Sequence, residues 1–187
     1  MGELLALRWA DISFNHKIVT SEGLEERPYL YVSRTYRRGV FTPPKNGKDR
    51  KVDMSPQLKN ILLEHRTNEK KKGLALGLGA EPELVFNRNG RVIEQNYIRR
   101  VFKRILTKAG LRDMKLHGLR HTYASLLLSK GVWPVYVKEQ LGHHSIQITV
   151  DIYGRWIPNH EAPAVNRLDD ATTCNLSATR ASNEDIT

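Results

Sequence analysis

The chain has 187 residues, an apolar fraction of 40% and a formal net charge of +10. This length suits one domain with its own core and a short tail, and the sequence has no run of roughly 18 apolar residues, the length needed to span a bilayer. The single cysteine excludes an internal disulfide and fits a reducing compartment. No basic segment of a secretory signal opens the chain, so we expect a cytoplasmic protein.

The positive charge is concentrated in the first part of the chain. Residues 158–187 contain two basic and five acidic side chains, a net charge of −3, which leaves +13 for the preceding 157 residues. A body this basic favours a polyanionic partner, most commonly nucleic acid. The alternative is a charged surface that serves solubility.

The first third of the chain predicts one helix followed by strands. Residues 1–11 have the apolar pattern of a helix, although no capping residue precedes Gly2. Strand-forming residues follow, separated by turn-formers, at 12–14, 18–20, 29–32 and 50–54. We expect a small antiparallel sheet of about three strands, with its last turn at residues 45–48.

The remaining pattern is mainly helical as far as about residue 170. Helices are predicted from Ser55-Pro56 to Gly73, over residues 94–109, from 117 to 131, from 132 to 142, and after Ser145. The Gly-rich connector at 73–83 lacks the spacing of a phosphate-binding loop. The fold class expected from this pattern is α+β and mainly helical.

The predicted helix at 94–109 combines two apolar rows with a set of cations. These cations are Arg99, Arg100, Lys103, Arg104 and Lys108, with no acidic residue among them. Such a set suits either a DNA phosphate backbone or a solvated face, and the sequence leaves both open.

Most of the unusual chemistry lies within residues 115–156. His117 and Arg120 are three residues apart, so a helix places them on one face. His121 is four residues from His117, a spacing that also suits a metal. However, Gly118 stands where a zinc-binding HExxH helix carries glutamate, and no Cys/His cluster completes a site. We expect no metal.

The same residue types fit phosphoryl transfer on a nucleic-acid backbone. Arginine and histidine can hold the non-bridging oxygens of a phosphate, and a tyrosine can act as the covalent nucleophile once its proton is removed. A lysine on a hairpin can protonate the leaving 5′ oxygen. The chain offers each part, as Arg120, His117, His143, Tyr153 and Lys45. Each alone also has a structural interpretation, as a core tyrosine, a helix-terminal histidine or an edge-strand charge.

The order of these motifs resembles the catalytic domain of the tyrosine site-specific recombinases, the phage-integrase family. The matching boxes are His117–Thr122 (HGLRHT), Leu141–His143 (LGH), a tyrosine ten residues further on, and the opening segment GELLALRWADI. The resemblance implies a catalytic domain over residues 1–168 in which a small antiparallel three-stranded sheet packs on a bundle of helices. Residues 169–187 are polar and aperiodic, so we expect a flexible tail.

The resemblance also implies roles for single residues. Tyr153 would attack the scissile phosphate and form a 3′-phosphotyrosyl bond, while Arg120 and His143 hold the non-bridging oxygens. His117 would take up the tyrosine proton or orient the phosphate, and Lys45 would act as general acid.

Further residues and partners follow from the same resemblance. Glu3 would support the arginine site. The family acts on double-stranded DNA as a homotetramer, with no metal, cofactor, small-molecule substrate or membrane, so we expect a nucleoid-associated protein. The cations expected to contact DNA are Arg99, Arg100, Lys103, Arg104 and Lys48.

One departure from the family pattern concerns its first arginine. The pattern Arg-x-Gly-Glu, matched at Gly2-Glu3, places that arginine one position before Met1, and Arg8 corresponds to a different family position. We expect that the family's core-binding domain is missing as well. Losing a fixed guanidinium costs on the order of 2–4 kcal/mol in transition-state stabilisation, so we expect weak or no recombinase activity. Three functions stay open: a DNA strand transferase, a catalytically inactive DNA-binding remnant of an integrase, or a relative of type IB topoisomerases or nucleases.

Overall fold

The computed structural model of the protein describes residues 1–44, 47–77 and 81–156. The predicted general acid Lys45 and the predicted tail at 169–187 therefore lie outside the described residues. Within the described ranges, no helix combines the length and apolarity needed to cross a membrane.

The first eleven residues do not form one helix, so that prediction is wrong. Helix α1 (Gly2–Ala6) ends at Leu7, whose backbone is extended, and a 3₁₀ helix follows at Trp9–Asp11. The break has a tertiary cause: Leu7 accepts a hydrogen bond from the amide of Val85, and the amide of Trp9 donates to Glu83. Pairing with a distant segment thus replaces the helical hydrogen bonds of this stretch.

The predicted antiparallel sheet is confirmed. It consists of β1 (Ile12–Ser13), β4 (Tyr29–Val32) and β7 (Arg50–Asp53), in the order β1-β4-β7. Leu30 of the central strand pairs with Ile12 on one side and Val52 on the other. This register places β7, which carries Arg50 and Asp53, at one edge of the sheet.

Three hairpins lie outside this sheet. They are β2–β3 (Lys17–Thr20 and Gly23–Glu26), β5–β6 (Thr35–Arg37 and Val40–Thr42) and β8–β9 (Asn87–Arg88 and Arg91–Val92), among the residues that the structure describes. Strand β6 pairs with β5 and not with β7. The predicted last turn at 45–48 lies partly outside the described residues and stays a prediction.

The predicted helices after the sheet are all present, with ends within a few residues of expectation. They are α2 (Pro56–Ala75), α3 (Gln95–Lys108), α4 (Gly118–Ser129), α5 (Pro134–Leu141) and α6 (Ile146–Tyr153), followed by a 3₁₀ turn at Gly154–Trp156. Two caps act as the sequence predicts: Ser55 accepts a hydrogen bond from the amide of Leu58, and Ser145 accepts one from the amide of Gln147.

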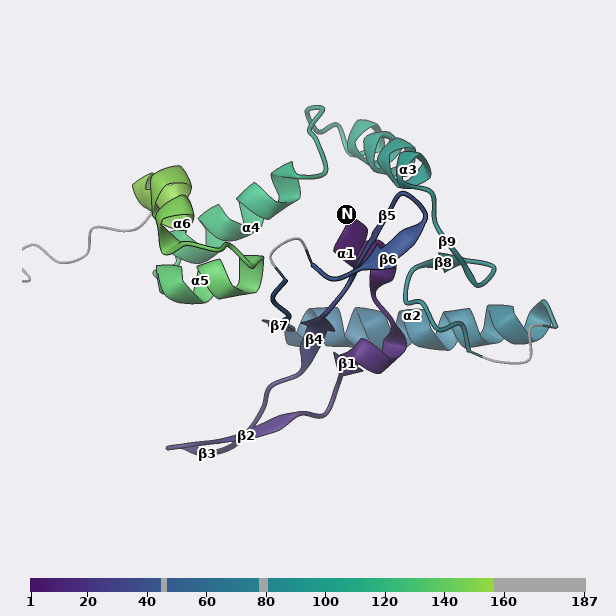
Figure 1. The fold of residues 1–187 in the computed structure, drawn as a ribbon, viewed down its shortest axis with the longest axis horizontal. Coiled ribbons are helices and arrows are strands. Elements are labelled where there is room, and N and C mark those ends of the chain that lie inside the picture. The colour runs from purple at the N-terminus through teal and green to yellow at the C-terminus, as the bar shows by residue number, and fades with distance from the viewer. Residues whose placement is uncertain (45–46, 78–80, 157–187) are drawn as a thin grey trace, which may run out of the picture.

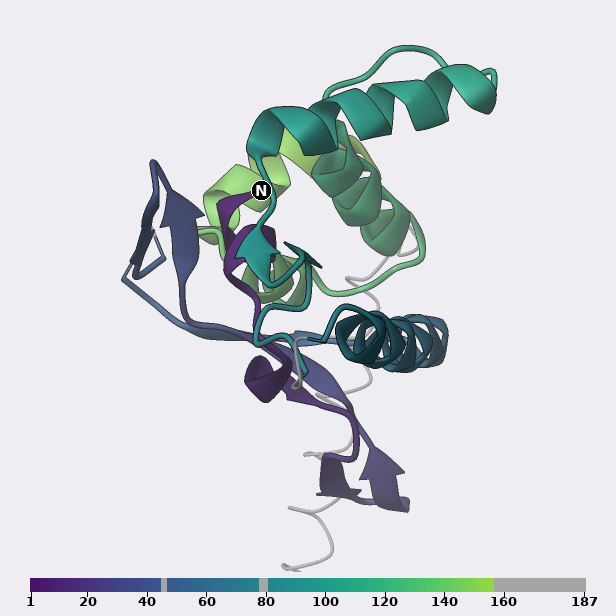
Figure 2. The same cartoon turned by 90° about the vertical axis from the view of Figure 1, so that its right-hand side faces the viewer.

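The described residues form two separate hydrophobic cores. The first, around Leu7, Trp9, Met54, Leu62 and Val85, lies between the sheet region and α2. The second, around Ala124, Leu128, Val137, Leu141 and Tyr153, joins α4, α5 and α6. Figure 1 shows the α4–α6 group at the left and α2 at the lower right, and in Figure 2 α2 lies below the α4–α6 group.

Polar contacts around Asp53 fasten the two cores together where α5 packs against β7. The Asp53 carboxylate accepts hydrogen bonds from the Tyr136 hydroxyl at 2.9 Å and from Arg27 at 3.0 Å. The Asp53 amide donates to the side-chain oxygen of Gln140 at 2.8 Å. Because Asp53 ends β7 and Gln140 belongs to α5, these contacts fix the helix group against the sheet.

Candidate active site

A cleft of about 990 Å³ lies at this junction of the two cores. The predicted site residues that line it are Glu3, Lys48, His117, Arg120, His143 and Tyr153. They come from α1, the segment before β7, the start of α4, the turn after α5 and the end of α6. Side chains far apart in the sequence are therefore gathered around one space.

The predicted DNA-contacting cations of α3 do not line this cleft. Arg99, Arg100, Lys103 and Arg104 are exposed on α3, the helix that lies at the top of Figure 2. Arg99 and Lys103 border a neighbouring cavity of about 620 Å³ whose lining includes His117 and Arg120. The absence of acids within this helix is offset at one position, because Lys103 lies 3.3 Å from Asp113, which follows the helix.

Arg120 is half-buried and lines the cleft. Its guanidinium donates a hydrogen bond to the backbone carbonyl of Leu141, which ties α4 to the end of α5. Burial lowers the pKa of Arg120, and the charge of Arg50 lowers it further, while Glu3 acts in the opposite direction. An arginine stays protonated under such conditions, so Arg120 presents a fixed positive charge.

Arg50 is a second guanidinium in the cleft, and sequence reasoning missed it. Two of its nitrogens donate hydrogen bonds to the Glu3 carboxylate, at 2.8 and 2.7 Å, and its Nε donates one to the Gln140 carbonyl at 3.3 Å. The hydrogen bond from Arg50 holds the pKa of Glu3 below its ordinary value. No sequence signal singles out Arg50, which stands in a strand beside Lys48 and Lys51.

The turn between α5 and α6 positions His143. Gly142 ends α5 in the left-handed region, at φ +67°, where glycine is the favoured residue. The Nδ1 atom of His143 is hydrogen-bonded to the hydroxyl of Thr149 at 2.9 Å. Burial lowers the pKa of His143, as does the nearby charge of Arg120. Thr149 was also missed, although a polar residue four positions before Tyr153 on the buried side of α6 was an available signal.

Tyr153 belongs to the second core and is 3% exposed. Its hydroxyl lies 2.7 Å from Nδ1 of His121, a residue that the sequence suggested only for metal binding. The ring of His121 also lies edge-on to that of His117, with centroids 5.1 Å apart. Burial raises the pKa of Tyr153, whereas the charge of Arg120 favours the phenolate. Burial and the neighbouring charges of His121 and Arg120 lower the pKa of His117.

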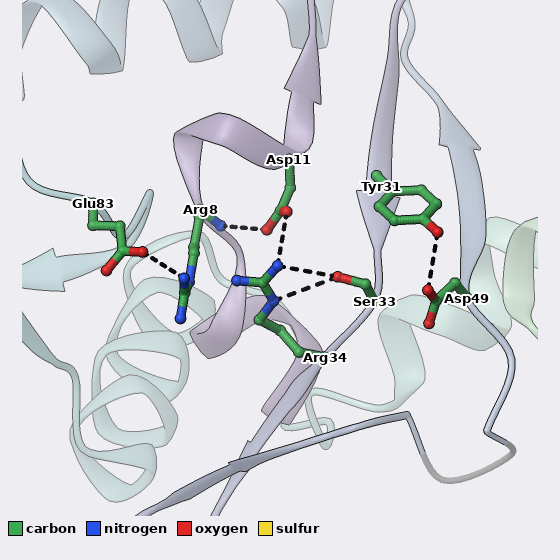
Figure 3. A network of polar contacts seen from close by, with 7 residues as sticks. All are labelled: Arg8, Asp11, Tyr31, Ser33, Arg34, Asp49 and Glu83. Carbon is green, nitrogen blue, oxygen red and sulfur yellow. Dashed lines mark hydrogen bonds and ion pairs between the residues drawn. The ribbon is translucent and has the colours of Figure 1, made fainter.

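Arg8 is not among the residues that line the cleft. Its guanidinium lies over the ring of Phe41. The same guanidinium pairs with Glu83, and the amide of Arg8 donates to the Asp11 carboxylate (Figure 3). Asp11 in turn accepts a hydrogen bond from Arg34. These contacts hold Arg8 in a separate network, so it does not supply a guanidinium to the cleft.

The chemistry available in the cleft is that of an anion site beside a nucleophile. Arg120 supplies a permanent charge, His117 and His143 supply further nitrogen donors, and Tyr153 supplies a hydroxyl. Among the residues that the structure describes, no three or more His, Cys, Asp or Glu side chains are placed to hold a metal ion.

Comparison with known proteins gives a consistent set of relatives. The model of the phage integrase family matches residues 1–160. A tyrosine recombinase XerC-like protein of Caldanaerobacter subterraneus subsp. tengcongensis is 33% identical over 177 residues, which cover 90% of this chain and 45% of that protein. The ICEBs1 integrase of Bacillus subtilis is 28% identical, with the same coverage of both chains. The chain thus spans a little under half the length of these curated relatives.

Solved structures share the fold. The XerH site-specific recombinase bound to difH substrate, in a pre-cleavage complex, superposes with a TM-score of 0.57 at 25% identity, covering 81% of this chain and 37% of that one. The Tn1549 transposon integrase in complex with a circular intermediate DNA gives a TM-score of 0.63 at 18% identity, covering 92% and 54%.

Proposed function

The chain belongs to the phage integrase family, and from that premise we propose that it cleaves and rejoins double-stranded DNA through a 3′-phosphotyrosyl intermediate. This is the chemistry of site-specific recombination and integration. The observation that supports it is the convergence of Tyr153, Arg120, His117 and His143 on one cleft. A phosphate bound there would lie beside both a nucleophile and positively charged or hydrogen-bond-donating side chains.

The proposed reaction balances without a cofactor. The phenol oxygen of Tyr153 attacks the scissile phosphorus, a Tyr153–phosphorus bond forms, and the bond to the 5′ oxygen breaks. Arg120 and His143 hold the non-bridging oxygens, whose charge grows in the transition state. Rejoining reverses these steps with the 5′ hydroxyl of another strand. The phosphotyrosyl bond conserves the energy of the phosphodiester, so no high-energy compound is needed.

Lys45 is proposed as the acid that protonates the leaving 5′ oxygen. The segment that carries it precedes β7, and its neighbours Pro44 and Lys48 line the cleft. Glu3 is proposed to support the arginine site, and it would do so through the two hydrogen bonds that its carboxylate accepts from Arg50. The carboxylate orients one guanidinium beside the other.

DNA is proposed to reach the cleft across α3. Arg99, Arg100, Lys103 and Arg104 are exposed there, and the cavity beside Arg99 and Lys103 adjoins His117 and Arg120. The cations along this path would release counterions from the DNA phosphates, so binding would be tight at low salt. Two of the similar structures, of XerH and of the Tn1549 integrase, are complexes with DNA. We further propose assembly as a homotetramer on DNA, in the cytoplasm at the nucleoid.

A trapped intermediate tests this function. The probe is a duplex with a 5′-bridging phosphorothiolate at a fixed position, flanked by randomised base pairs. Its thiolate leaves without a general acid, so even a slow enzyme accumulates adduct. We expect a covalent protein–DNA band under denaturing conditions that Tyr153→Phe abolishes. A full chain that binds the probe but forms no Tyr153-dependent adduct contradicts strand transfer.

The second candidate is a DNA-binding protein without turnover. The observation that favours it is the burial of Tyr153, which leaves 3% of the residue exposed in the DNA-free protein. In that case Tyr153→Phe leaves DNA affinity and every other measured property unchanged. Relaxation of supercoiled plasmid without a preferred site points instead to the topoisomerase alternative.

A further inference from the structure

The Tyr153 hydroxyl is in direct contact with a histidine to which no catalytic role has been given. The phenol oxygen lies 2.7 Å from Nδ1 of His121, within the range of a short, strong hydrogen bond. His121 comes from the second turn of α4 and Tyr153 from the last residue of α6, so tertiary packing creates the contact. Both residues line the cleft with Arg120.

We propose that His121 is the general base that takes the Tyr153 proton during strand cleavage. This inference rests on the proposed function and specifies one step of it. The phenol O–H bond breaks, a bond from that proton to Nδ1 of His121 forms, and the oxygen lone pair attacks phosphorus. When the strands are rejoined, His121 returns the proton to the phenol oxygen as the bond to phosphorus breaks.

The surroundings of the pair suit such a transfer. Tyr153 is buried in an apolar cluster, which disfavours its phenolate and makes a base in contact with the hydroxyl useful. His121 itself is exposed on α4, so its ring can be solvated when it carries the extra charge. Arg120 adds a positive charge that stabilises the phenolate. The ring of His117 packs edge-on against the ring of His121, and His117 stays available to contact the phosphate.

The same hydrogen bond has a second possible consequence, which is to hold the nucleophile inward and away from DNA. The variant His121→Asn separates the two roles. Its amide oxygen replaces Nδ1 as a hydrogen-bond acceptor but cannot take up the phenol proton. A holding role survives this change, whereas a base does not.

The experiment measures the rate of Tyr153–DNA adduct formation on the phosphorothiolate duplex library with the full chain. General-base catalysis contributes typically about 10²- to 10⁴-fold, so we expect His121→Asn to slow the reaction by at least about a hundredfold. We expect added imidazole to raise the rate of adduct formation by His121→Ala at least about tenfold. His16→Asn is the control, because His16 also contacts a tyrosine ring, that of Tyr29, away from the cleft. A His121→Asn rate within twofold of wild type, or above it, overturns the proposal.

A measurement without DNA keeps this inference separate from the proposed function. N-acetylimidazole transfers its acetyl group to a tyrosine oxygen, and peptide mass spectrometry reports the rate at Tyr153 relative to the half-exposed Tyr123. We expect His121→Asn to slow acetylation of Tyr153 several-fold. Equal or faster acetylation excludes a base role. If the wild-type chain forms no DNA adduct but acetylation of Tyr153 is slowed in the variant, strand transfer is contradicted and the proton transfer to His121 is not.

Discussion

The guanidinium of Arg50 and the carboxylate of Glu3 face each other through two hydrogen bonds, of 2.8 and 2.7 Å. The same guanidinium donates its Nε to the carbonyl of Gln140. One side chain therefore joins α1, β7 and α5, the three elements that border the cleft from the side of the sheet. Its position beside Arg120 makes the placement of the two positive charges interdependent.

Replacing Arg50 by alanine should weaken both the fold and the site. The half-buried Glu3 carboxylate loses its partner, and removing one partner of a buried polar pair costs about 1–3 kcal/mol. We expect a loss near the lower end in urea unfolding, because both side chains are partly exposed to solvent. Adduct formation should fall about tenfold or more, as Arg120 loses its neighbour.

The matched control is Glu3→Gln/Arg50→Gln, in which an amide pair replaces the ion pair. This double variant should recover most of the stability lost in Arg50→Ala. If Arg50→Ala unfolds at the same urea concentration as wild type, the pair does not hold the three elements together.

Gly142 makes a second, independent test of the space around Arg50. An added Cβ at Gly142 would lie 3.0 Å from atoms of the Arg50 side chain, in a backbone with φ +67°. Gly131 has φ +77° with nothing within 4 Å of the added atom, so Gly131→Ala carries only the conformational cost of about 1–2 kcal/mol. We expect Gly142→Ala to lose about 1 kcal/mol more than Gly131→Ala in urea unfolding.

Combining the two sites identifies the source of this extra loss. In Gly142→Ala/Arg50→Ala the contact no longer exists. The loss of stability in the double variant should therefore be smaller than the sum of the losses in the two single variants. Strict additivity would show that Arg50 does not restrict the turn that carries His143.

The features that the sequence predicted depend on local rules. The spacing of His117 and Arg120 follows from the helical repeat, and the end of α5 follows from Gly142. The cap at Ser145 places the start of α6 and hence Tyr153. Each of these requires only a few neighbouring residues, and for this reason a single sequence contains the information.

The features that the sequence did not predict depend on tertiary placement. The helix expected at residues 1–11 is broken because Leu7 and Trp9 bond a segment near Val85. The partnership of Arg50 with Glu3 and the contact of His121 with Tyr153 join distant elements. A basic residue in a strand and a second histidine in a helix have many ordinary interpretations, so only the packing of the two cores reveals them.

Two of the histidines that line the cleft, His117 and His143, should make stability depend on pH. The pKa values of His117 and His143 are below their ordinary value of 6.5, chiefly because of burial. As the pH falls through 6.5, the unfolded chain takes up protons that the folded chain does not, so the free energy of unfolding decreases. It should rise again toward neutral pH, where both states are uncharged at these groups.

Urea unfolding between about pH 5 and 7.5 measures this dependence. Glu3 contributes at lower pH, since its pKa lies below 4.5 and its stabilisation is lost only as the pH falls through that range. We expect His143→Gln and His117→Gln each to flatten the slope. A wild-type slope unchanged by both substitutions would contradict the lowered pKa values.

The cations of α3 should control DNA affinity without affecting the chemistry. Arg99→Glu/Arg100→Glu reverses two exposed charges of α3, of which Arg99 borders the cavity next to the cleft, so DNA binding should weaken at low salt. Each lost phosphate contact should reduce the slope of log K against log salt by about 1.

Lys71→Glu/Lys70→Glu is the matched control, because it makes the same charge change near the end of α2, away from the cleft. Fluorescence anisotropy with labelled duplex DNA across a salt series reports both quantities. If the α3 and α2 variants lose affinity equally, DNA responds to net charge alone and α3 is not the contact surface. A slope reduced only in the α3 variant, with adduct formation at saturating DNA unchanged, assigns this helix to binding and leaves the cleft to catalysis.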